Sequence, residues 1–129
     1  MTEGMQPLKT SAVAGADLSA KQYYFVKLSA DNTVVVCTAA TDLPFGVLQN
    51  TPASGDAAEI CVVGETKVSG DADLDFGQLI GTSGDGQADR KIPGTDTTEY
   101  IVGQVKRGNG AAGGLVTAVV NCASPSRAA

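Results

Sequence analysis

Short runs of β-branched and aromatic residues alternate with turn residues along most of this chain. Val, Ile, Tyr and Phe favour strands, whereas Gly, Pro, Asn and Asp mark the turns between them. On this basis we predict strands at residues 23–28, 33–38, 45–49, 58–63, 65–68, 76–82, 87–92, 100–105 and 115–120. No stretch has an apolar stripe at helical spacing longer than about two turns. The pattern therefore predicts an all-β protein.

The second half of the chain repeats the plan of the first half. Each half contains an apolar strand with an internal Gly, then a Gly-rich turn and a strand that ends in Val. The spacing from Gly46 to Val62 is sixteen residues, and so is the spacing from Gly103 to Val119. A Gly inside a strand often marks a bend or bulge. The match predicts one bend made twice, and an internal duplication is one explanation of it.

Frequent turns and seven to nine short strands indicate a small sandwich or a partly closed barrel of short antiparallel strands. We predict a single β domain over residues 15–122. Residues 1–14 lack periodicity and contain Pro7, which disfavours helix in its neighbourhood, so we expect an extended, flexible N-terminal arm there. Residues 123–129 are expected to form a flexible tail.

The composition changes this picture in one respect, the size of the core. The chain has 129 residues, enough for one domain, and aromatic residues make up only 5% of it. Burial of apolar surface contributes about 25 cal/mol per Å² to stability, and each Ala or Val side chain buries little such surface. A subunit with so thin a core would gain from burying more surface against copies of itself, so we expect an oligomer.

The charge argues against nucleic acid as a partner. The net charge is −5, and the nine Lys and Arg residues are scattered, whereas phosphate binding needs them clustered. The first residues lack the basic and apolar regions of a secretory signal, and the apolar runs are too short to cross a membrane. We therefore expect synthesis as a soluble protein in the cytoplasm, without a membrane partner.

Catalytic chemistry is not indicated. The chain has no His, which removes the commonest general base, and the three Cys residues are widely spaced without a CxxC pair. Asp71, Asp73 and Asp75 alternate as at the start of a calcium-binding loop. However, the Gly and the Glu that such a loop needs at its positions 6 and 12 are replaced by Phe76 and Thr82. We predict no enzyme activity, no metal and no cofactor.

One rival hypothesis is a carrier domain with a lipoyl or biotinyl group on Lys, because such domains are also small duplicated β-structures. Lys67 is the residue tested for this role. It lies within strand-like sequence, whereas a carrier Lys occupies the tip of a tight hairpin. The hypothesis therefore lacks support from the sequence.

Several turn and strand motifs recur in a characteristic order, at residues 15–23, 25–28, 44–50 with Pro52, 55–58 and 100–103. The most specific part is a Gly-Val-Leu-Gln-Asn-x-Pro stretch followed by a Gly-Asp turn. This order of elements, over about residues 15–122, resembles that of the capsid decoration proteins, or cement proteins, of tailed bacteriophages. These motifs are structural turns and do not include a catalytic signature.

The resemblance implies a virion protein on the outer capsid surface that binds the expanded capsid and bridges major capsid protein subunits, commonly as a homotrimer. It would stabilise the head against internal genome pressure. Within this hypothesis the N-terminal arm is expected to contact the capsid through Met5, Pro7, Leu8 and Lys9. The alternative is a β-rich virion module that binds host surface glycans or another tail or fibre component.

Overall fold

The computed structural model describes residues 8–109 and 111–129. These residues form eleven strands and, within the described ranges, no helix. No helix among them is long and apolar enough to span a membrane. The strands are β1 (Leu8–Ala14), β2 (Phe25–Ala30), β3 (Thr33–Val36), β4 (Gly46–Leu48), β5 (Ala57–Ser69), β6 (Leu79–Thr82), β7 (Ala88–Arg90), β8 (Tyr100–Ile101), β9 (Gly103–Arg107), β10 (Leu115–Asn121) and β11 (Ser126–Arg127).

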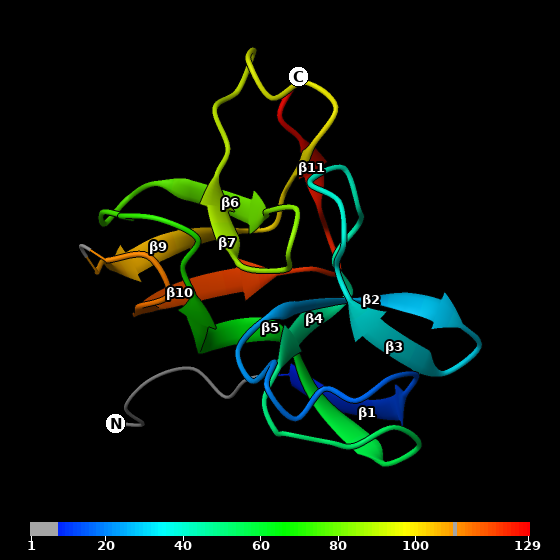
Figure 1. The fold of residues 1–129 in the computed structure, drawn as a ribbon. Coiled ribbons are helices and arrows are strands. Elements are labelled where there is room, and N and C mark those ends of the chain that lie inside the picture. Colours follow the sequence, from blue (N-terminus) through cyan, green and yellow to red (C-terminus); the bar gives the residue numbers. More distant parts are fainter. Residues whose placement is uncertain (1–7, 110) are drawn as a thin grey trace, which may run out of the picture.

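The first lobe is a closed ring of five strands, on the right in Figure 1. β2 and β3 form an antiparallel hairpin, β2 also pairs with β4, and β4 pairs with β5. β1 closes the ring, because it pairs with β5 in the antiparallel sense and with β3 in the parallel sense. The sheet is therefore mixed, which corrects the prediction of antiparallel strands alone.

The second lobe has the same topology and takes β5 as its first strand. The second part of β5 pairs with β10, β10 with β9, β9 with β6, and β6 with β7. A single parallel bridge between Gly70 and Ala88 stands where the β1–β3 pairing closes the first ring. One thirteen-residue strand, β5, is thus shared by both lobes and lies between them in Figure 1.

The two lobes match in register as well as in topology. In the hairpins, Val26 pairs with Val36, and Ile80 pairs with Arg90. The hydrogen bonds around the turns correspond too. The amides of Ala14 and Gly70, each at the end of its lobe's first strand, donate to the carbonyls of Asp56 and Gly114 respectively, at 2.9 Å in both cases.

Left-handed backbone occurs at the same three places in each lobe. The residues before the hairpin are Tyr23 (φ 69°) and Gly77 (φ 83°). The other matching pairs are Asn32 with Gly86 at the hairpin turn, and Gly55 with Gly113 before the last strand. Residues that carry a side chain rarely adopt this backbone conformation. Its occurrence at three equivalent positions of the two lobes therefore indicates that the fold is one unit used twice.

The two Gly residues on which the repeat was predicted have the same structural role. A Cβ atom at Gly46 would lie 2.6 Å from the carbonyl oxygen of Cys61, and one at Gly103 would lie 2.7 Å from that of Val119. Each Gly therefore allows close approach of the neighbouring strand. In the sheet, Gly103 pairs with Val120. The sixteen-residue spacing from Gly103 to Val119, on which the repeat was predicted, therefore ends one residue before the actual pairing partner.

Both ends of the predicted domain need correction. Residues 8–14, assigned to the arm, form β1 and pair with β5 and β3; residues 1–7 lie outside the described residues. The segment 123–129, predicted as a flexible tail, includes β11, which pairs with β8. Ala128 is fully buried, and its amide donates to the carbonyl of Glu99 at 3.0 Å.

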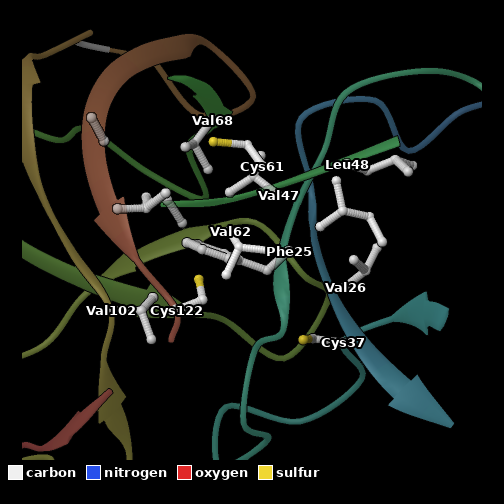
Figure 2. Close-up of a cluster of buried hydrophobic side chains, with 14 of the residues drawn as sticks. Phe25, Val26, Cys37, Val47, Leu48, Cys61, Val62, Val68, Val102 and Cys122 are labelled. Atoms are coloured by element: carbon white, nitrogen blue, oxygen red, sulfur yellow. The ribbon is translucent and has the colours of Figure 1, made fainter. Parts of the chain in front are cut away.

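The core runs through both lobes as one cluster of small and medium-sized apolar side chains. Val is its commonest member, and Phe25 is its largest fully buried side chain. Figure 2 shows Phe25 beside Val62, among side chains from several strands. This core is as thin in large side chains as the composition predicts, so close backbone packing of the kind seen at Gly46 carries much of the cohesion.

We predict that Gly46→Ala and Gly103→Ala each lower the free energy of unfolding, by about 1–3 kcal/mol or more, because the new methyl group overlaps a strand carbonyl. Denaturant unfolding followed by circular dichroism measures this. Gly84→Ala is the control, since a Cβ atom there meets nothing within 4 Å. Equal stability of all three variants would contradict the proposed role of the two Gly residues.

Candidate functional site

The predicted contact residues at the N-terminus divide between described and undescribed parts of the chain. Met5 and Pro7 lie outside the described residues, whereas Leu8 and Lys9 begin β1. Leu8 is 59% exposed, and the Lys9 ammonium lies 3.2 Å from the Glu59 carboxylate. The exposed apolar side chain beside a surface ion pair gives this strand end a mixed surface suited to protein contacts.

A second surface feature is an apolar groove of about 400 Å³ between the first lobe and the segment that follows β10. Leu28 and Leu43 are about half exposed on it, at 52% and 49%. Exposed apolar side chains gathered in one hollow are typical of contact surfaces. The groove is lined by Lys27, Leu28, Leu43, Pro44, Phe45, Cys122, Ala123 and Pro125.

One carboxylate organises the rim of this groove. Asp42 accepts hydrogen bonds from Lys27 Nζ at 2.9 Å and from the amides of Thr38 and Ala39 at 2.9 and 3.0 Å. Burial opposes ionisation of Asp42, but these donors outweigh it and lower the pKa of the carboxyl below its ordinary value. The loop that presents Leu43 is thereby fastened to β2.

The three thiols are buried and unsuited to chemistry. Burial raises the pKa of Cys37 and of Cys122 to about 12, and it also raises the pKa of Cys61. A thiol is nucleophilic only as a thiolate, so these residues stay protonated and unreactive at neutral pH. They are free cysteines that pack in the core (Figure 2).

Among the described residues, Lys91 is the one charged residue that is buried. The side chain of Lys91 is fully buried and forms ion pairs with Asp89, at 3.2 Å, and with Glu99. The amides of Lys91 and Cys37 make equivalent hydrogen bonds in the two lobes, to the carbonyls of Leu79 and Phe25. Lys91 and its ion pairs thus occupy in the second lobe the position that the Cys37 thiol occupies in the first. These ion pairs connect β7 to the segment before β8.

These groups do not form a catalytic arrangement. Among residues 8–109 and 111–129, no group of three or more Cys, Asp or Glu side chains could hold a metal ion. Lys67 lies within β5, away from a hairpin tip. What the described surface offers is an exposed end of β1 and an apolar groove.

Comparison with solved structures gives the fold a precedent. The structure is similar to that of the N base of the head fiber gp8.5 of bacteriophage phi29, with a TM-score of 0.63. The likeness covers 91% of this chain and 96% of that chain, at 20% sequence identity. No protein-family model matches the sequence, and no curated protein matches it. At this identity the likeness establishes a shared fold.

Sequence reasoning did not find the groove. Its walls come from β2, from the loop before β4 and from the segment after β10, which are distant along the chain.

A further difference concerns Phe76, which was predicted to begin a strand. β6 begins only at Leu79, and Phe76 lies in the turn before it with 80% of its surface exposed.

We predict that Asp42→Ala lowers the free energy of unfolding by about 1–3 kcal/mol at pH 7, because three donors lose their acceptor. The pKa of Asp42 is lowered in the folded protein. Its contribution is therefore present above the ordinary Asp pKa, near 4, and disappears as the pH falls through the folded value. Denaturant unfolding at several pH values measures the difference.

The control for this prediction is Asp56→Ala, whose exposed carboxylate makes no hydrogen bond with the described residues. Its stability should stay close to wild type at every pH. A gap between wild type and Asp42→Ala that persists undiminished down to pH 2 would show that the carboxylate charge is not the source of the stabilisation.

Proposed function

We propose that this chain is a structural protein of a bacteriophage head, a decoration or cement protein that binds the outer surface of the expanded capsid. The observation that carries the proposal is the fold. A base of a phage head fiber has the same architecture over almost the whole of both chains. The turn motifs that resemble decoration proteins support the same assignment from the sequence.

The role that we propose is to bridge major capsid protein subunits and to stabilise the head against internal genome pressure. A ligand that binds only one state of a structure shifts the equilibrium toward that state by mass action, so modest contacts repeated around a shell are sufficient. The shared strand suits this role. Because β5 belongs to both lobes, a pull on one lobe is transmitted through a continuous hydrogen-bonded sheet to the other.

The contact that we propose for the N-terminal segment uses Met5 and Pro7, followed by Leu8 and Lys9. One edge of β1 pairs with β5, and its other edge pairs with β3 only at Val13 and Ala14. Among the described residues, no strand pairs with that second edge at Leu8 to Ala12. An exposed strand edge can accept a further strand from a partner through main-chain hydrogen bonds. We also propose that the protein assembles as a homo-oligomer, because its thin core favours burial against further copies; the resemblance to decoration proteins favours a homotrimer.

The test uses expanded, DNA-free shells of the phage that encodes the chain. We expect purified protein to cosediment with these shells to a saturating number of copies, and to raise the temperature at which the shells break, as measured by light scattering. Binding to host cells without binding to shells would contradict the proposal, and would favour a receptor-binding module that recognises surface glycans.

Deletion of residues 2–7 tests the N-terminal contact without removing β1. We expect the truncated protein to fold as the wild type does, because β1 keeps its pairs with β5, but to bind shells more weakly. Circular dichroism checks the fold, and cosedimentation measures the affinity. Undiminished binding of a folded truncated protein would rule out a role for this segment.

A further inference from the structure

The repeat provides an internal comparison at the turn that precedes each hairpin. In the first lobe the amide of Tyr23 donates to Leu48 O at 2.7 Å, and in the second the amide of Gly77 donates to Val105 O at 2.7 Å. Both residues have left-handed backbone. The preceding residue is Gln22 in the first lobe and Phe76 in the second. The same backbone turn therefore forms with Gln in place of Phe at this position, so its main-chain geometry does not depend on the Phe76 side chain.

Among the residues that the structure describes, Phe76 is the most exposed large hydrophobic one, at 80%. Its turn is nevertheless well held. The Gln104 side-chain amide donates to Gly77 O at 3.1 Å, and the Asp75 amide donates to the Gln78 side-chain oxygen at 3.1 Å. A large apolar side chain presented to water on an ordered turn is typical of an anchor that fills a pocket on a partner.

Carboxylates precede Phe76 in the sequence of this turn. Asp71, Asp73 and Asp75 are all exposed on the same segment. Partial burial raises the pKa of Asp71, and the negative charges of Asp85 and Asp89 raise it further. Two more carboxylates therefore lie near Asp71. In the first lobe, Gly15, Asp17 and Lys21 occupy the positions of Asp71, Asp73 and Asp75, so only one of the three acids has a counterpart there. The acidic rim, like the aromatic anchor, belongs to the second lobe alone.

A second loop lies beside the Phe76 turn. Leu74 and Asn109 form an antiparallel bridge, and the Gly113 amide donates to Gly70 O at 2.7 Å. In Figure 1 the segment before β6 and the β9–β10 turn protrude together at one end of the second lobe. The segment that carries Phe76 and the loop between β9 and β10 are therefore held together.

We propose that Phe76, with Asp71, Asp73 and Asp75 around it, is the anchor by which the second lobe docks on the head shell. It inserts into an apolar pocket of the shell protein that is rimmed by Lys or Arg. This inference rests on the proposed function and assigns one contact within it. It makes the second lobe a docking element in addition to the N-terminal segment.

Charge favours the shell over another copy of this chain as the occupant. The chain carries a net charge of −5, and its nine basic residues are mostly engaged already. Four of them form ion pairs, and Lys21 and Arg127 lie over Tyr24 and Tyr100. A basic rim around a pocket is therefore better supplied by a different protein than by a second acidic subunit.

The test is Phe76→Gln, which gives the second lobe the residue that the first lobe has at this turn position. We expect wild-type thermal stability and at least about ten-fold weaker binding to expanded, DNA-free shells, measured by quantitative cosedimentation. Higher salt should weaken wild-type binding by screening the acidic rim. Wild-type affinity of Phe76→Gln would overturn the inference.

The matched control is Gln22→Phe, which exposes the same side chain on the first lobe. We expect this variant to bind as the wild type does, and the double variant Gln22→Phe/Phe76→Gln to bind as weakly as Phe76→Gln. Restored binding of the double variant would show non-specific stickiness and would overturn the inference. If the wild-type protein itself failed to bind shells, the proposed function would fail instead, so the two failures are distinguishable.

Discussion

The continuity of β5 through both lobes is the constraint on which the rest of the structure depends. Residues 57–63 of this strand pair with β1 and residues 63–69 pair with β10, so one segment completes the first ring and begins the second. The two lobes cannot separate without breaking this strand's hydrogen bonds. With a core made mostly of Val and Ala, that shared backbone compensates for the apolar burial that larger side chains would supply.

Close backbone approach is the second consequence of the same design. At Gly46 and Gly103 a strand carbonyl lies nearer than a side chain would permit, and the two lobes make this close approach at equivalent places. Because the repeated unit holds its turns by main-chain hydrogen bonds, their side chains are free to differ between the lobes. The Gln22 and Phe76 positions show this difference.

The sequence predicted the strands and the repeat because both depend on local signals, namely β-branched runs, turn residues and two evenly spaced Gly residues. It missed β1, whose residues Leu8–Ala14 lack the strand pattern and gain their conformation from pairing with β5. It also placed Phe76 in a strand, because an aromatic residue beside Leu79 and Ile80 favours one. The apolar groove depends on which loops meet in space, and such meetings leave no local pattern.

The most direct test of the central claim, that the fold serves attachment to a phage head, is cryo-electron microscopy of expanded, DNA-free shells incubated with the protein. The account predicts added density on the outer surface at regular positions between capsid subunits. It also predicts that the end of the second lobe that carries Phe76 faces the shell. Shells that stay bare at saturating protein concentration would contradict it.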